Sequence, residues 1–232
     1  MINNEILLIF SLFFIYGLVL IWFYLFGEKG LLCFIVFTTI LANIEVILVI
    51  KAFSLEQTLG NILFGASFLA TDMLSEFYGK NSSKKAVIIG ILTSISFVIL
   101  SQSWLLYDVI NGLDEPFKII FSNTPRVMLS SLVVYAISQF FDVWIYHKWW
   151  TFTQKISGDK RKYLWLRNNG STLTSQFINS LLFTFFAFYG TYSLNTLLNI
   201  FISSYVIFIV TSILDTPIIY LSRYLYENKI IK

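Results

Sequence analysis

Two carboxylate side chains lie within one apolar segment, residues 60–80, which reads GNILFGASFLATDMLSEFYGK. Asp72 and Glu76 are four residues apart, so in a helix they share one face. Two carboxylates this close in a medium of low dielectric do not both ionise unless a cation lies nearby. The spacing therefore predicts a site completed by a positive partner: a Lys or Arg, a proton, or a cationic substrate. The alternative is that Glu76 lies at the end of the segment and forms an exposed ion pair with Lys80.

Four further apolar segments carry polar side chains, mostly at helical spacing. One stripe consists of Tyr135, Gln139, Asp142 and Tyr146. A second stripe consists of Thr172, Gln176 and Asn179. Asp215 shares a helix face with Thr211, whereas Asn43 and Glu45 point to different faces.

Hydrogen bonds between helices explain a single buried amide, but polar groups on five segments favour a shared binding site. A carboxylate at membrane depth costs at least about 2.5–3.5 kcal/mol, so such groups usually face a partner, a cavity or a substrate path. The predicted substrate-binding residues are Asp72, Glu76, Gln139, Asp142, Gln176 and Asn179, with Asn43, Glu45 and Asp215 as a second group.

The residues that enzymes use for catalysis are sparse. The chain has one histidine, His147, and one cysteine, Cys33, so neither a histidine-based acid–base pair nor a metal site is predicted. No G-x-S-x-G, H-E-x-x-H or P-loop pattern occurs. Two membrane aspartates could form an aspartyl protease, but no aspartate within the apolar segments is flanked by glycine. The sequence therefore predicts a protein that is not an enzyme and holds no cofactor and no metal.

The composition is that of an integral membrane protein. Hydrophobic residues make up 57% and charged residues 12% of the 232 positions, whereas a soluble domain has about 25% charged residues. A span needs roughly 20 apolar residues, and the candidates are residues 5–26, 31–50, 59–78, 85–106, 127–146, 172–189 and 196–221. No Lys or Arg precedes the first segment and no small-residue cleavage site follows it, so we expect a helix rather than a signal peptide. The expected fold is one all-α transmembrane domain of about seven helices.

The basic residues divide unevenly between the two sides of the predicted membrane. If all these segments span, one side holds only Lys51, Lys118 and Arg126 out of 16 Lys and Arg residues. The positive-inside rule places the other, richer side in the cytoplasm, so the amino terminus is outside and the carboxyl terminus inside. We expect the basic loops to contact anionic lipid and not nucleic acid. Arg126 and Arg167 lie at span ends and are expected to be topology anchors.

Several segments in register resemble a known family. Residues 70–80 (ATDMLSEFYGK), 138–149 (SQFFDVWIYHKW), 164–190 (LWLRNNGSTLTSQFINSLLFTFFAFYG) and 40–46 (ILANIEV) are similar to the queuosine precursor transporter family, a vitamin-uptake-like group of bacterial membrane proteins. The resemblance extends from about residue 31 to 221. Some members begin with the helix that matches residues 31–50. The expected organisation is therefore an additional N-terminal helix (1–28), a six-helix transporter core (29–222) and a cytoplasmic tail (223–232).

The resemblance implies import of 7-deazaguanine bases across the bacterial cytoplasmic membrane for salvage of queuosine in tRNA. The bases would be 7-cyano-7-deazaguanine, 7-aminomethyl-7-deazaguanine or queuine. A carboxylate such as Asp72 can accept the ring N–H and the exocyclic amine of such a base, and an aminomethyl group adds a cation for a second carboxylate. The predicted amides can bond the base carbonyl and ring nitrogens, and aromatic rings can stack on the planar base.

Several alternatives remain open at this stage. The chain could be a self-sufficient secondary transporter in which Asp72 or Asp215 carries a coupling proton. It could instead be a substrate-binding subunit that docks on an ATPase, for which the small residues Ala66, Ser67, Ala70 and Thr71 offer either a docking face or ordinary helix packing. It could form a homo-oligomer or carry another small polar solute. In a membrane scaffold, the polar stripes would only join helices.

The division of basic residues predicts a topology that fusions can test. A reporter placed after Lys162 and one placed after Lys232 should both report the cytoplasm, because both positions lie on the side of the predicted membrane that carries most of the basic residues. An external signal at either position would rule out the arrangement with about seven helices.

Overall fold

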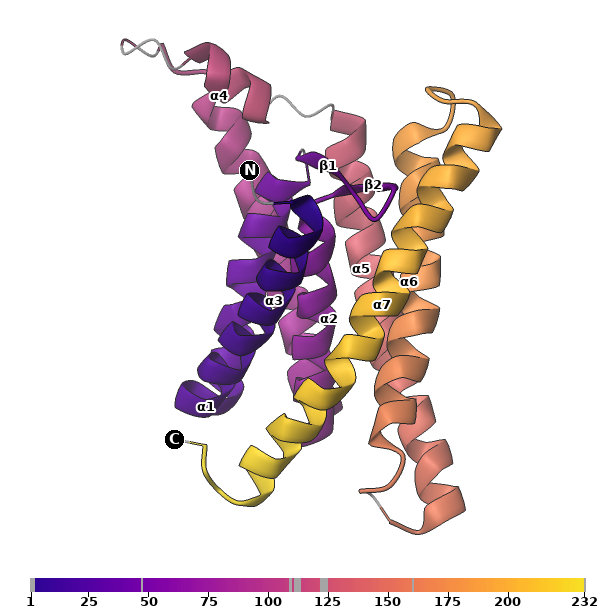
Figure 1. Cartoon of the computed structure of the whole chain (residues 1–232). Helices are drawn as coiled ribbons and strands as arrows, with labels where there is room; N and C mark the ends of the chain where they lie inside the picture. The colour runs from indigo at the N-terminus through magenta and orange to yellow at the C-terminus, as the bar shows by residue number, and fades with distance from the viewer. Residues whose placement is uncertain are drawn as a thin grey trace.

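The protein is a bundle of long helices with a short β-hairpin at one end (Figure 1). The computed structural model describes residues 3–46, 48–108, 110, 114–121, 125–159 and 161–231. Lys160 and Lys232, which belong to the predicted basic side, lie outside the described residues. The elements are α1 (Asn4–Glu45), β1 (Val49–Ala52), β2 (Leu55–Thr58), α2 (Gly60–Phe77), α3 (Lys80–Trp104), α4 (Asp114–Phe121), α5 (Pro125–Ser157), α6 (Leu164–Phe188) and α7 (Leu194–Glu227).

Helix α1 is a helical hairpin that reverses at Gly27. The backbone there has φ 54° and ψ −129°, a combination that residues with a Cβ rarely adopt. The two halves then pack side by side, with the ring centroid of Trp22 6.4 Å from that of Phe34 and 6.1 Å from that of Phe37. The two helices predicted on either side of residue 27 are therefore confirmed, although no loop separates them.

The β-hairpin was not predicted. Strands β1 and β2 are antiparallel, with Val49 opposite Thr58, and the turn between them has positive φ at Phe53 and Ser54. The prediction of a helix to residue 50 was wrong at its end, because α1 stops at Glu45 and Ile50 lies in β1. A short run rich in β-branched residues suits a strand as well as a helix, and apolar character alone does not separate the two.

The exposed and buried surfaces of the bundle are those of a multi-pass membrane protein. Among the described residues, four helices are long and apolar enough to cross a membrane: α1, α3, α5 and α7. The more polar α2 and α6 match the predicted third and sixth spans. Almost all of α2 is buried, and α6 buries its polar face. Polar groups inside and apolar groups outside are what a membrane interior requires.

The two termini lie at opposite ends of the bundle (Figure 1). The amino terminus lies beside the β-hairpin, where Asn4 donates to the carbonyl of Lys51. We call this the hairpin end. At the opposite, C-terminal end, a Cβ at Gly27 would lie 3.0 Å from the Tyr78 hydroxyl and 3.4 Å from Ile231. The loops predicted to share the basic side thus meet at one end of the bundle with the C-terminal tail.

The reversal at Gly27 predicts a large difference between two glycine substitutions in α1. Gly27→Ala should lower stability by about 1–3 kcal/mol, because alanine is strained at this φ and ψ and its Cβ approaches Tyr78. Gly17→Ala is the matched control, since a Cβ at Gly17 meets no atom within 4 Å and alanine favours a helix. Thermal unfolding of the purified variants in detergent measures both effects. Equal melting temperatures would contradict the assigned reversal.

Candidate functional site

Two buried carboxyl groups meet where α2, α5 and α6 pack together. Asp72 on α2 is 1% exposed and Asp142 on α5 is fully buried. Helix α6 supplies a hydroxyl donor to each: Thr172 Oγ1 donates to Asp72 Oδ2 over 3.0 Å, and Ser175 Oγ donates to Asp142 Oδ1 over 2.7 Å. The two carboxyl groups also lie in hydrogen-bonding contact with each other. We call Asp72 and Asp142 the carboxyl pair.

The carboxyl pair has unused capacity to accept hydrogen bonds. Asp72 Oδ1 and Asp142 Oδ2 receive no donor from the described residues other than what the two carboxyl groups share. Carboxyl groups in contact inside an apolar interior need a proton, a cation or N–H donors to be stable together. The arrangement can therefore bind a proton, or a ligand that presents N–H groups or a positive charge.

Two buried amides beside the pair differ in how far they are satisfied. Gln139 bridges α5 to α2, because its Nε2 donates to Ser67 Oγ over 3.0 Å and its Oε1 accepts from Thr71 Oγ1 over 3.2 Å. Gln176 is fully buried on α6, yet neither amide atom has a hydrogen-bond partner among the described residues. The amide of Asn168, one helical position after Arg167, is in the same state. Buried polar atoms of this kind usually contact a ligand or a water.

We call the carboxyl pair together with Gln139 and Gln176 the polar layer. A cavity of about 470 Å³ lies between this polar layer and the hairpin end. Its volume falls within the range of about 300–1,000 Å³ that is typical of small-molecule pockets. Aromatic rings form part of its wall, with the ring centroid of Phe64 5.8 Å from that of Tyr135 and 6.0 Å from that of Phe208. Ser67 and Asn179 also line it. Ser67 precedes Asp72, and Asn179 follows Gln176, by about one helical turn. The cavity therefore ends about one turn from the carboxyl pair, on the side of the hairpin end.

A separate cluster of charges lies on the C-terminal side of the pair. Glu76, one turn after Asp72, accepts from Arg167 Nη2 over 2.8 Å and from Arg167 Nε over 3.2 Å. It also accepts from Arg223 on α7 and from the Tyr146 hydroxyl on α5. This charged group is almost wholly buried.

Comparison with known proteins places this architecture in a family. Residues 58–222, which include every helix that carries the polar layer, match a family model described as "Putative vitamin uptake transporter". The chain belongs to this family of uptake transporters. A protein of Bacillus subtilis (strain 168) named "Probable queuosine precursor transporter" is 36% identical over 231 residues, which is 98% of each chain. No solved structure gives a significant match. The family predicted from the sequence motifs is thus confirmed.

The transporter fold brings most of the predicted site residues together. Asp72, Gln139, Asp142 and Gln176 form the polar layer, and Asn179 borders it from the cavity. Asn43 lines the same cavity. Asp215 is buried on α7, where it lies near the Tyr16 hydroxyl of α1. Glu45 is partly exposed at the last position of α1 and does not line the cavity.

Two expectations about charge in this transporter need correction. The prediction that Arg167 is a topology anchor at a span end was wrong: Arg167 is 1% exposed and pairs with Glu76. The alternative reading, an exposed pair of Glu76 with Lys80, is excluded by the same contact. The positive partner predicted for the two carboxylates exists, but it neutralises Glu76 and not Asp72. Ninety-one residues separate Arg167 from Glu76, so no local spacing could reveal their contact.

The two glutamines predict opposite effects on stability. Gln139→Met removes the two hydrogen bonds that Gln139 makes with α2 and should destabilise the protein by about 1–3 kcal/mol. Gln176→Met removes an amide that has no partner among the described residues, so stability should be unchanged or slightly higher. Thermal unfolding of both purified variants without added ligand distinguishes them. An equal loss in both would mean that Gln176 is also bonded within the protein.

Proposed function

We propose that this protein imports 7-deazaguanine precursors of queuosine across the bacterial cytoplasmic membrane. One observation carries the proposal: Gln176 and the carboxyl pair are buried hydrogen-bonding groups with unused capacity, next to a partly aromatic cavity of about 470 Å³. A family relative whose name refers to a queuosine precursor supports the same substrate. The predicted 7-deazaguanine bases are planar, polar and small enough for such a cavity.

The chemistry of the layer fits the edge of such a base. The ring N–H and the exocyclic amine are two donors in one plane, and the free oxygens of Asp72 and Asp142 can accept both. The Gln176 amide can bond the base carbonyl through its N–H and a further donor through its oxygen. Phe64 and Tyr135 can stack on the base as it enters.

We further propose that the chain crosses the membrane seven times. The two halves of α1 and the helices α2, α3, α5, α6 and α7 would be the spans, with the hairpin end outside and the C-terminal end in the cytoplasm. The basic loops collected at the C-terminal end support this orientation. In this scheme, residues 1–28 form the additional helix, 29–222 the six-helix core and 223–232 the tail.

We propose a carrier that works without an ATPase subunit and performs no chemical conversion of its substrate. The small residues that could have docked a partner protein, Ala66, Ser67, Ala70 and Thr71, are buried inside the bundle, so their role is packing between helices of this chain. Within the carrier, the carboxyl pair is the natural place for a coupling proton, because its two groups already need one when no substrate is bound.

Uptake in a bacterium that cannot make queuosine tests the function directly. The chain is expressed without any ATPase partner, each 7-deazaguanine base is supplied separately, and queuosine in tRNA is measured. Queuosine should appear with at least one of the precursors. Its absence with all of them, while the protein is present in the membrane, would overturn the proposed substrate or the claim of self-sufficiency. Restoration by co-expression of an ATPase module would identify the second cause.

Asp72→Asn is expected to be the most damaging single change in the layer. An amide in place of the carboxylate turns an N–H toward the donors of the base, which should weaken binding by about 1–3 kcal/mol, or roughly tenfold to more than a hundredfold. Binding to the purified, folded variant and uptake in cells are both measured. Asp108→Asn is the control, because it removes the same charge from an exposed position near the hairpin end. Lost uptake with normal binding would assign Asp72 to proton coupling, and normal uptake would remove it from the site.

A further inference from the structure

Four helices converge on one carboxylate at the C-terminal side of the carboxyl pair. Glu76 of α2 accepts hydrogen bonds from Arg167 of α6, Arg223 of α7 and Tyr146 of α5, the last over 2.5 Å. The side chains of Glu76 and Arg167 are 3% and 1% exposed, and that of Arg223 is 13% exposed. We call these four residues the ionic cluster.

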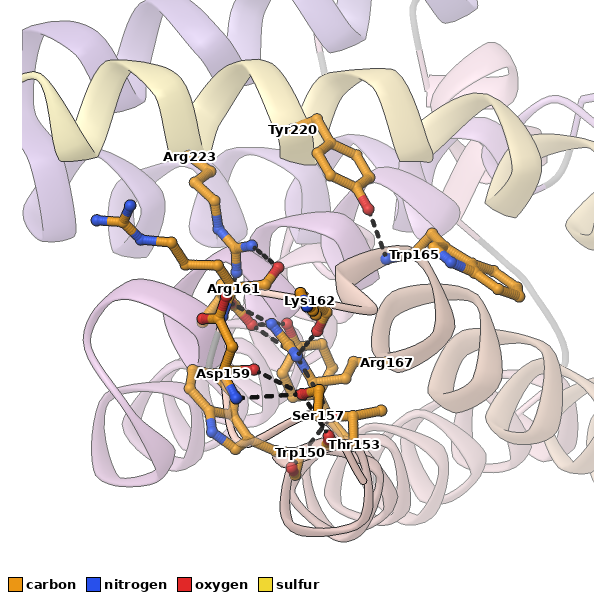
Figure 2. A network of polar contacts seen from close by, with 12 residues as sticks. Trp150, Thr153, Ser157, Asp159, Arg161, Lys162, Trp165, Arg167, Tyr220 and Arg223 are labelled. Atoms are coloured by element: carbon orange, nitrogen blue, oxygen red, sulfur yellow. Dashed lines mark hydrogen bonds and ion pairs between the residues drawn. The ribbon is translucent and has the colours of Figure 1, made fainter. Parts of the chain in front are cut away.

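The ionic cluster also holds the connection between α5 and α6 (Figure 2). Arg167 Nη1 donates to the carbonyl of Lys162 over 2.8 Å, and Arg223 Nη1 donates to the carbonyl of Arg161 over 2.6 Å. The Arg167 guanidinium lies over the Trp150 ring, 4.7 Å from its centroid. The helices, the connection and the aromatic ring together close the C-terminal end around the Glu76 carboxylate.

The opposite end of the molecule is arranged differently. The cavity reaches the hairpin end, where the exposed residues Glu56 and Tyr192 line it. The carboxyl pair thus lies between a cavity that reaches one end and a charged closure at the other. Glu76 follows Asp72 and Tyr146 follows Asp142 by four residues, so the same two helices carry the pair and the closure one turn apart.

The balance of charge makes Glu76 the residue on which the closure depends. It is the one carboxylate in a cluster with two guanidinium groups, and a buried charge that loses its partner is strongly destabilising. Without Glu76, Arg167 and Arg223 would face each other as like charges, which would drive α6 and α7 away from α2. Water or a competing charge at the membrane surface can weaken the ion pairs of such a closure. A closure made of packed apolar side chains has no charged group on which water or charge could act.

We propose that the ionic cluster is the inner gate of the transporter and that Glu76 holds this gate closed. The structure then has its substrate site accessible from the hairpin end and closed toward the cytoplasm. Separation of Glu76 from Arg167 and Arg223 opens a path from the carboxyl pair to the cytoplasm. This inference rests on the proposed transport function, and it adds the residues that decide to which side the site is accessible.

Labelling of engineered cysteines tests the gate without any substrate. The background is Cys33→Ala, because Cys33 is the only cysteine of the chain and is exposed. Ser75→Cys reports on the inner side, since Ser75 lies on α2 between Asp72 and Glu76. Ser180→Cys reports on the cavity, which Ser180 lines. Both serines are buried, and their hydroxyls have no partner among the described residues. A charged thiol reagent that does not cross membranes is applied from the cytoplasmic side in inverted vesicles and from outside in whole cells.

Glu76→Gln should raise labelling of Ser75→Cys from the cytoplasmic side severalfold and lower labelling of Ser180→Cys from outside. This reciprocal change is the signature of a gate, because loss of structure would raise both. Glu115→Gln is the matched control, because Glu115 forms an exposed ion pair with Lys118 on α4, away from the ionic cluster, and such a surface pair contributes little. It should leave both rates unchanged.

Should Glu76→Gln fail to fold, Arg223→Gln takes its place, since it leaves the contact between Glu76 and Arg167 intact. It should shift both rates in the same directions by a smaller factor. Unchanged labelling of Ser75→Cys, or a rise at both positions, would overturn the gate. A wrong substrate assignment would not affect these rates, so failure of the gate and failure of the proposed function are distinguishable.

Discussion

A carboxyl group in the middle of a membrane must find a donor, a proton or a cation, and the core of this protein is built around that constraint. Helix α6 meets it with hydroxyl groups. Thr172 and Ser175 each donate to one member of the carboxyl pair, so α6 joins α2 to α5 through polar bonds. Small hydroxyl residues also let the helices approach closely. The same residues that hold the three helices together therefore surround two carboxyl groups whose hydrogen-bonding capacity is only partly used.

The polar interior is organised in levels along the bundle. Cavity, carboxyl pair and ionic cluster follow one another from the hairpin end to the C-terminal end, with spacings of about one helical turn. Each level answers the problem of burial differently. The cavity leaves room for a ligand, the pair depends on a shared proton or a bound donor, and in the cluster two guanidinium groups pair with the Glu76 carboxylate. Helices α2, α5 and α6 contribute residues to all three levels.

The outer helices isolate this interior from lipid. The first half of α1 buries one face, including Leu12, Tyr16 and Val19, and turns Phe10, Phe13 and Phe14 outward. Tyr16 donates to the carbonyl of Thr211 on α7, one turn before Asp215. The reversal at Gly27 returns the chain beside α2, so this N-terminal helix packs on the core directly. A chain of 232 residues with 12% charged positions can thus keep several ionisable groups at membrane depth.

Composition and helical spacing were sufficient to predict the membrane class, the approximate helix positions and the polar stripes, because apolar length and a period of 3.6 residues are local properties of a chain. The motif at residues 70–80 led to the family for the same reason. Contacts between segments that are far apart in the sequence could not be predicted from the sequence. Nothing near Glu76 indicates that Arg167 and Arg223 neutralise it, and nothing near Gln176 indicates that its amide is left without a partner. The reversal at Gly27 and the β-hairpin depend on how the helices meet. The sequence thus indicated most of the polar groups that are buried, although not Arg167. Only the tertiary structure decided which of them have hydrogen-bond partners, because the donors come from other helices.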